Sequence, residues 1–445
     1  MPLPKPITND QREAELAAYA RDQQAVAGVE HLRFFPQSIS GGLGAWLRTS
    51  AGREVLDFSA SWTAAAFGHG NEAVAEAISA AARNGGGASV LSSAIDETTR
   101  LAEGLIDLVP LRETDRAEKR AYLGLGGTDA NTVAIAAARH VTGRSGIVAF
   151  RGSYHGGHGP SEQVSGIGIP VGQDAPQSRL VEYPVAQSDL DHTRAQLTSL
   201  LATEDFAAVI VEAVQCDGGV LVPPADFLPL VRELCDAHGV LLVVDEVKAG
   251  LGRTGQLLAY QATDVRPDLV TLGKSLGGGL PVSAAVGPRD ALSEPRASAL
   301  LTTAGAPIPA AAANAVLDLL EDGSLARRTA RLGEIARQAL ETYRASDRPG
   351  HAAVVDVRGR GLLLGLELGS VAGFSPDQVA ALAVYRAWEL GCALYVVRDN
   401  VLEITPPLVI GEAELLEGIE CILTAIDDVA AKHVPLDTIA QYGGW

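Results

Sequence analysis

The sequence has few cysteines and too few basic residues to balance its acidic ones. Its four cysteines, Cys216, Cys235, Cys392 and Cys421, form no C-x-x-C pair. In a chain of 445 residues this pattern predicts reduced core cysteines of a cytosolic protein rather than a disulfide framework. Lysine and arginine number 35 against 54 aspartates and glutamates, so the net charge is −19. Such acidity argues against nucleic acids and anionic membrane surfaces as partners.

Long apolar runs are also absent from the sequence. No uncharged apolar stretch is long enough to span a bilayer, and the first residues, MPLPKPITNDQREAEL, contain no apolar signal core. The chain is nevertheless 47% hydrophobic, so it can bury one large core or two. We therefore expect a soluble, cytoplasmic enzyme.

The middle of the chain alternates apolar strand patterns with helical patterns, which is typical of an α/β fold with a mostly parallel sheet. The predicted strands are Arg120–Leu125, Gly146–Phe150, Ala207–Val214, Val240–Val244, Leu269–Leu272 and Val282–Val286. The helices predicted around and between them are Asn71–Arg83, Asp96–Leu108, Asp129–Val141, Leu190–Leu201 and Ala225–His238. Residues 157–183 are rich in glycine and proline and are expected to form a long loop.

We expect three parts in the chain. Residues 1–58, with a helix at Gln11–Val26 and a hairpin at Ala45–Phe58, are an N-terminal segment that packs with a small domain. Residues 59–308 form a large domain, and residues 309–445 form the small α+β domain. The elements predicted for the last part are helices Pro309–Glu321, Leu325–Ala345, Pro376–Leu390 and Glu412–Ala430, with strands Ala353–Val357, Leu362–Leu368, Cys392–Val397 and Val401–Ile404.

Two reactive residues follow neighbouring apolar strands. Asp245 comes directly after Val240–Val244, and Lys274 comes just after Leu269–Leu272. Open parallel sheets place ligands at the carboxyl ends of their strands, so these two side chains are expected to converge. A lysine that condenses with an aldehyde, and an aspartate that keeps a ring nitrogen protonated, are what pyridoxal phosphate (PLP) needs. Taken singly, Asp245 could equally be a turn residue and Lys274 a solvated surface amine.

Three other motifs do not carry a function. The pattern G-x-G-x-x-G at residues 250–255 is separated from the preceding strand, and Gly273-Lys274-Ser275 has no glycine at the P-loop position before it. Neither predicts a nucleotide site. His155 and His158 lie in one glycine-rich loop with no third ligand nearby, so we predict no metal.

Gly126-Gly127-Thr128 ends a strand and opens a helix, where backbone N–H groups can bind a phosphate. An ordinary strand–helix turn has the same pattern. Taken by themselves, the three residues leave both interpretations open.

Several motifs together carry a family resemblance. They are DEVKAGLGRTG and LGKSLGGGLP in residues 245–281, LGGTDAN, FRGSYHGGHGP, VEAVQCD and TTAGAP. As a set they resemble class III (ornithine/ω-amino) aminotransferase-fold PLP enzymes over most of the chain. The resemblance implies PLP fold type I, with a large domain built on a seven-stranded, mostly parallel sheet between helices, and a small domain from both chain ends.

The resemblance also assigns the cofactor contacts. Lys274 would bond the PLP aldehyde and Asp245 would hold the ring nitrogen. The amides of Gly127 and Thr128, with the Thr128 hydroxyl, would bind the phosphate, and Tyr154 would stack on the ring. Thr302 would reach the phosphate of a neighbouring subunit, which implies a homodimer with shared sites.

Departures from the family pattern concern the substrate. Lys248 stands where the family has a glutamine near the cofactor's phenolic oxygen, and Glu403 stands where an arginine usually holds a substrate carboxylate. Glu403 would repel a carboxylate and would better receive an amide, lactam or amine. With Trp62 in DFSASWTAAAFGHG, these departures resemble α-amino-ε-caprolactam racemase and related amino-amide racemases.

We therefore predict a PLP-dependent racemase or epimerase that acts at the α-carbon of an amino amide, a lactam or an amino acid. Lys274 would move the α-proton on one face, and the resemblance gives the opposite face to Asp217. The alternative is a class III aminotransferase for ω-amino acids or amines, since both reactions begin in the same way. A binding protein that kept the fold and lost its chemistry is a third hypothesis, which the Lys274–Asp245 pair disfavours.

Overall fold

The computed structural model describes residues 4–203 and 205–442. It divides into two compact units, one made of Met1–Asn71 with Arg328–Trp445 and the other of Glu72–Arg327. The limits that we expect from the sequence, after residues 58 and 308, differ from these and stay a prediction. Within the described part of the chain, none of the helices is both long and apolar enough to cross a membrane.

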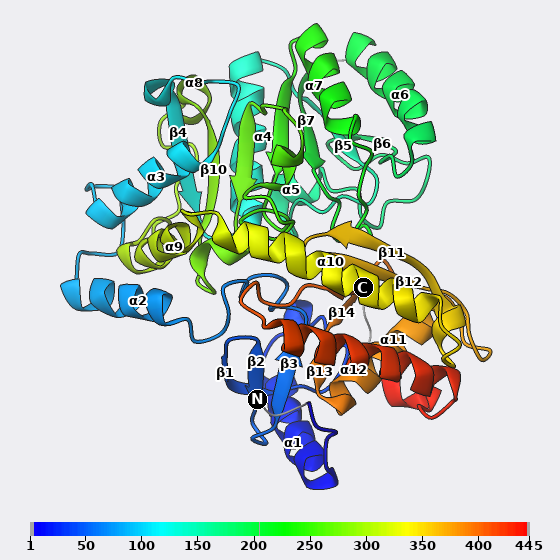
Figure 1. Cartoon of the computed structure of the whole chain (residues 1–445). Coiled ribbons are helices and arrows are strands. Elements are labelled where there is room, and N and C mark those ends of the chain that lie inside the picture. Colours follow the sequence, from blue (N-terminus) through cyan, green and yellow to red (C-terminus); the bar gives the residue numbers. More distant parts are fainter. Residues whose placement is uncertain (1–3, 204, 443–445) are drawn as a thin grey trace. The chain divides into compact units, whose positions relative to one another are not determined.

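The unit Glu72–Arg327 is built on a seven-stranded sheet of order β4-β10-β9-β8-β7-β5-β6 (Figure 1). Its strands are β4 (Lys119–Gly124), β5 (Gly146–Phe150), β6 (Arg179–Val181), β7 (Phe206–Glu212), β8 (Leu241–Asp245), β9 (Leu269–Leu272) and β10 (Ser283–Pro288). The run from β9 to β6 is parallel, and only β10 pairs antiparallel, with β4 and β9. This confirms the predicted mostly parallel, seven-stranded sheet.

The helices of this unit are α2 (Glu72–Asn84), α3 (Asp96–Leu108), α4 (Gly127–Thr142), α5 (Gly159–Glu162), α6 (Leu190–Thr203), α7 (Phe227–His238), α8 (Arg289–Leu292) and α9 (Pro307–Leu320). They begin and end close to the predicted positions, except that the single-turn helices α5 and α8 were not predicted. The expectation of a structureless loop over residues 157–183 was wrong, because α5 and β6 lie within it. A single helical turn and a three-residue strand are too short to leave a periodic pattern.

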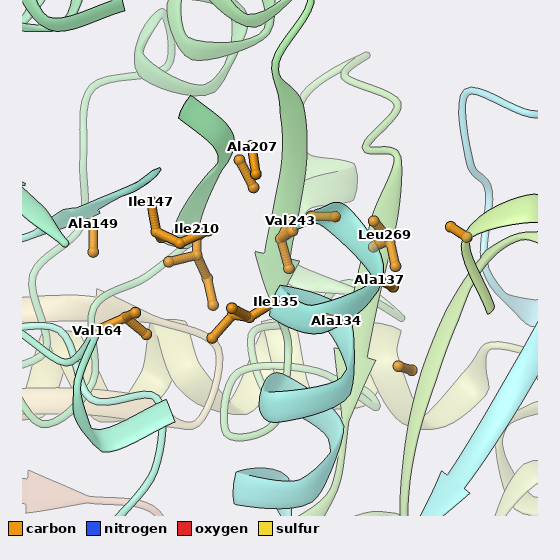
Figure 2. Close-up of a cluster of buried hydrophobic side chains, with 14 of the residues drawn as sticks. Ala134, Ile135, Ala137, Ile147, Ala149, Val164, Ala207, Ile210, Val243 and Leu269 are labelled. Atoms are coloured by element: carbon orange, nitrogen blue, oxygen red, sulfur yellow. The ribbon is translucent and has the colours of Figure 1, made fainter. Parts of the chain in front are cut away.

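Helix α4 packs against the sheet through small and branched side chains. Ile135 is buried in a cluster that also contains Ile210 of β7, Val243 of β8 and Leu269 of β9. Figure 2 shows Ala134 and Ile135 of the helix beside these strand residues. Truncating a buried isoleucine such as Ile135 to alanine typically costs about 2–5 kcal/mol. This core therefore holds the N-terminus of α4 firmly at the sheet.

The unit formed by both chain ends contains two four-stranded sheets, of order β1-β2-β3-β13 and β11-β12-β15-β14. Its strands are β1 (Ile39–Leu43), β2 (Trp46–Thr49), β3 (Glu54–Asp57), β11 (Val354–Arg360), β12 (Leu363–Leu368), β13 (Cys392–Ala393), β14 (Tyr395–Val397) and β15 (Val401–Ile404). Its helices are α1 (Asn9–Ala25), α10 (Ser324–Arg344), which starts in the other unit, α11 (Pro376–Leu390) and α12 (Glu412–Ala430). The predicted small α+β architecture is confirmed.

One predicted strand of this unit was wrong in kind. Residues 392–397 form two strands in different sheets, because β13 pairs with β3 and β14 pairs with β15. Leu394, which lies between them, is fully buried. The continuous apolar pattern hides the break, since both short strands are buried.

Candidate active site

The carboxyl ends of four neighbouring strands carry the polar residues of one cavity in the unit Glu72–Arg327. Glu212 ends β7 and Asp245 ends β8, while Tyr154 follows β5 and Lys274 follows β9. The cavity has a volume of about 190 Å³. Seven of the ten residues predicted for the site line it, namely Gly127, Thr128, Tyr154, Asp217, Asp245, Lys248 and Lys274.

Asp245 is nearly buried and its carboxylate is held by three donors. Oδ2 accepts from Nδ2 of Asn131 at 2.7 Å and lies 2.8 Å from Nδ1 of His155, which donates because a carboxylate only accepts. Oδ1 accepts from the backbone N–H of Val247 at 3.0 Å. The carboxylate therefore has a defined direction at the wall of the cavity.

Asn131 and Thr271 complete this network, and the sequence reasoning missed both. Asn131 also donates to the carbonyl oxygen of His155, and its own Oδ1 accepts from the Thr271 hydroxyl, both at 2.7 Å. A signal for Asn131 was present, since it lies four residues after Gly127 and hence one turn along the same helix face. His155 also has a role as a partner of Asp245, rather than the metal-ligand role considered for it.

Lys274 sits at a sharp turn directly after β9. Its backbone has φ of +44°, a left-handed conformation that costs a non-glycine residue roughly 1–3 kcal/mol. The single 3₁₀ turn Lys274–Gly277 follows at once, closed by Gly278 in the left-handed region. The strained turn thus directs a reactive amine at the cavity, a common arrangement at functional sites.

Asp217 and Lys248 form a buried ion pair in the cavity. Nζ of Lys248 donates to Oδ1 of Asp217 at 2.8 Å. Burial alone would raise the pKa of Asp217, but the ammonium groups of Lys248 and Lys274 outweigh it and lower that pKa below its usual range. The Asp217 carboxylate is therefore ionised at neutral pH.

Glu212 braces two backbone segments at the cavity wall. Its Oε1 accepts from the N–H of Tyr154 at 3.1 Å and its Oε2 from the N–H of Cys216 at 3.0 Å. Burial raises the pKa of Glu212 to about 7; the charge of His155 opposes this rise and that of Asp245 adds to it. Near neutral pH this carboxyl group is thus partly protonated.

The N-terminus of α4 is shaped to receive a phosphate. A Cβ at Gly127 would lie 2.6 Å from Cγ1 of Val247, so the Val247 side chain fills the space beside this residue and only glycine fits at the start of the helix. Asp129 accepts from the N–H groups of Leu125 and Gly126, at 2.9 and 3.0 Å, and so fixes the turn before the helix. Helix N–H groups stand at one end of the cavity, and Asp245 and Lys274 also line it. Together they form a set of groups that fits PLP.

Three predicted residues lie elsewhere. Thr302 is exposed on the turn before α9 and is not among the described residues that line the cavity. Trp62 and Glu403 belong to the other unit, where Trp62 stacks on Tyr395 with ring centroids 4.6 Å apart. Glu403 is buried on β15. Their roles toward a substrate stay predictions.

A metal site is not found in the described part of the chain, which contains no group of three or more histidine, cysteine or acidic side chains suited to one.

Comparison with known proteins gives one family. The model of the family described as aminotransferase class-III matches residues 28–426.

The chain belongs to the class III aminotransferase family. This class III enzyme is 32% identical over 413 residues to leucine/methionine racemase from Thermococcus litoralis, covering 88% of this chain and 91% of the relative. It is 35% identical over 403 residues to acetylornithine aminotransferase from Corynebacterium efficiens, covering 89% and 94%. Both activities thus occur among its relatives.

The fold of this class III enzyme matches a solved structure of ornithine aminotransferase from Toxoplasma gondii. The TM-score is 0.81 at 27% identity, over 96% of this chain and 99% of that one. That crystal structure has partial occupancy of PLP at its active site. The predicted family, fold and cofactor are therefore confirmed, and PLP is the cofactor of this enzyme.

Proposed function

We propose that this class III enzyme is a racemase or epimerase that inverts the α-carbon of an amino acid, an amino amide or a lactam. The observation that carries the proposal is that Asp217 lines the same cavity as Lys274. Inversion requires one group that removes the α-proton and a second that returns a proton on the other face. A carboxylate and an amine in one cavity supply two such groups.

Asp217 is suited to accept a proton because its pKa is lowered by Lys248 and Lys274 and the carboxylate is ionised. Lys248 keeps the carboxylate in place through their 2.8 Å hydrogen bond. Gly218 and Gly219 follow Asp217 and add no side chain of their own, although the Gln215 side chain packs closely against Gly218. Lys274 would act from the opposite face of the bound substrate.

PLP, when bound, withdraws electrons from the α-carbon of the attached substrate and makes its hydrogen acidic. Asp245 would accept the ring N–H, and the amides of Gly127 and Thr128 would bind the phosphate at the N-terminus of α4. Tyr154 would cover one face of the ring. These residues hold the cofactor, while Asp217 and Lys274 move the proton.

Glu403 and Trp62 are proposed to select the substrate. Glu403 is 2% exposed, so its charge would be poorly screened and would repel a substrate carboxylate. An amide, lactam or amine could instead donate to it. Trp62, stacked on Tyr395, would offer a flat apolar surface to the same substrate.

A class III aminotransferase is the second candidate, favoured by the 35% identity to acetylornithine aminotransferase. In that reaction Lys274 alone would move the proton, and Asp217 would have no proton to return. The two candidates therefore differ in whether Asp217 is needed for chemistry.

A deuterium experiment separates them. Single enantiomers of amino amides, lactams and amino acids are incubated with the enzyme in heavy water without a keto acid. We expect loss of optical rotation together with deuterium at the α-carbon, and a rate lowered about 10²–10⁴-fold in Asp217→Asn. Retained rotation, with amine transfer once a keto acid is added, would establish the aminotransferase instead.

We also propose a cytoplasmic homodimer. The turn that carries Thr302 is exposed and could meet a second copy, and the four cysteines are buried and form no disulfide with one another. Light scattering on the purified holoenzyme should give twice the mass of the 46.2 kDa chain. A monomer mass with full activity would contradict shared sites.

A further inference from the structure

We propose that Asn131 is a positioning residue that sets the direction of the Asp245 carboxylate and thereby how tightly the enzyme holds PLP. Asn131 is 1% exposed and all of its polar atoms are engaged. Its two N–H bonds point to Asp245 and to the carbonyl oxygen of His155, and its Oδ1 faces the Thr271 hydroxyl. This inference rests on the cofactor and not on which reaction the enzyme catalyses.

The Asn131 amide can adopt only one orientation here. A reversed amide would set its oxygen against the Asp245 carboxylate and the His155 carbonyl, three groups that only accept hydrogen bonds. Thr271 reinforces the observed orientation, because its hydroxyl donates to Oδ1 at 2.7 Å. Leaving such buried groups unpaired would be costly, so the amide is strongly held.

This orientation leaves one oxygen of Asp245 for the cofactor. Oδ2 accepts from both Asn131 and His155, which uses the two lone pairs of that oxygen. Oδ1 accepts only from the N–H of Val247 among the described residues, so it keeps one accepting position. The geometry therefore assigns Oδ1 to the ring N–H of PLP. Without Asn131 the carboxylate could rotate and divide its oxygens differently.

Asn131 also joins three elements that the cofactor must bridge. It lies on α4, one turn after Gly127, where the phosphate would bind. Its partner Asp245 ends β8, and its partner Thr271 lies opposite Asp245 in β9, three residues before Lys274. One side chain thus fixes the relative positions of the helix that would bind the phosphate, the carboxylate that would bind the ring nitrogen and the strand that leads to Lys274.

The test measures PLP binding to the full-length enzyme, by titrating the PLP-depleted protein and following visible absorbance. Asn131→Ala should raise the dissociation constant roughly tenfold to a hundredfold, as loss of a partner to a ligand-binding group typically does. Thr271→Val should give a smaller change in the same direction. The control is Asn314→Ala on α9, since Asn314 is equally buried and donates to the Glu97 carbonyl at 2.9 Å, away from the cavity.

The variant Asn131→Asp keeps the shape of the side chain and gives a second readout. The introduced carboxyl group can donate to Asp245 only while the introduced group is protonated. Once it is ionised, it repels the Asp245 carboxylate. PLP binding by Asn131→Asp should therefore weaken with rising pH more steeply than in the wild type. His155, Glu212, Asp245 and Lys274 are present in both proteins, so the difference between the two curves isolates position 131.

Two results would overturn the proposal. One is an unchanged dissociation constant in Asn131→Ala, or a loss of affinity that Asn314→Ala shares. The other is a pH dependence of Asn131→Asp that runs parallel to that of the wild type. Racemisation or amine transfer does not enter either measurement, so the reaction assigned to the enzyme can fail while this inference stands.

Discussion

The ammonium nitrogen of Lys248 lies 2.8 Å from Oδ1 of Asp217, and only 5% and 6% of the two side chains are exposed. A buried pair of this kind adds little net stability over apolar residues, but removing one partner leaves an uncompensated charge. In this enzyme the pair also lowers the pKa of Asp217. Stability and proton transfer should therefore respond together when Lys248 is replaced.

Lys248→Met should lower the free energy of unfolding by about 3–5 kcal/mol and shift the acidic limb of the kcat/KM profile to higher pH. The reason is that burial then raises the pKa of Asp217 without opposition from Lys248. Denaturant unfolding and pH–rate profiles measure the two effects. Adding Asp217→Leu should restore most of the stability and none of the racemisation. The control Arg232→Met breaks the buried pair with Asp268, and should lower stability without moving the profile.

Lys274→Ala should abolish covalent attachment of PLP, because Lys248, the other lysine among the described residues that line the cavity, is held in its ion pair with Asp217. Borohydride reduction followed by mass spectrometry should find the cofactor on a peptide containing residue 274 in the wild type and on none in the variant. This result does not depend on how PLP binding by the variant changes with pH. A borohydride-stable adduct at any other lysine of Lys274→Ala would contradict the assignment.

Gly127→Ala should weaken PLP binding at least tenfold, since the added Cβ would lie 2.6 Å from Cγ1 of Val247 and would displace the helix N-terminus that is proposed to bind the phosphate. Gly126→Ala is the matched control, because a Cβ there meets no atom within 4 Å. Titration with PLP compares the two neighbours directly. Equal affinities of both variants for PLP would show that the phosphate does not bind at the N-terminus of α4.

Glu212→Gln should change how stability depends on pH. The folded-state pKa of Glu212 is raised to about 7, so between its unfolded value and pH 7 the folded state binds more protons than the unfolded state. Stability from this group is therefore present at low pH and is lost as the pH rises through about 7, by roughly 3 kcal/mol in all. Denaturant unfolding at pH 5 and pH 8 should show this loss in the wild type relative to the variant.

The buried Glu246 has a pKa raised to about 7 as well, but it is present in both proteins and cancels in that comparison. A difference between wild type and Glu212→Gln that stays constant over this pH range would show that Glu212 is ionised throughout. In that case its contacts with the Tyr154 and Cys216 amides would be those of a permanent carboxylate.

Much of the site could be predicted because it follows local rules. Asp245 and Lys274 each come at the end of an apolar strand, and parallel strands bring their carboxyl ends to one edge. The glycine at position 127 is also recognisable locally, because it comes directly before a helix pattern. These features depend on residues close in the chain, so apolar runs and turns could place them, and the motifs of the family resemblance assigned their roles.

The sequence by itself determined the parallel sheet, the family and the cofactor, since each follows from a short apolar run or a motif, and it predicted seven of the residues that line the cavity. Only the tertiary structure decided that Asn131 holds Asp245, 114 residues away, and that Lys248 pairs with Asp217 rather than standing alone. The physical reason is that such contacts depend on how α4 docks on the sheet and how buried polar groups find partners. Both are properties of the packed core that no local pattern records.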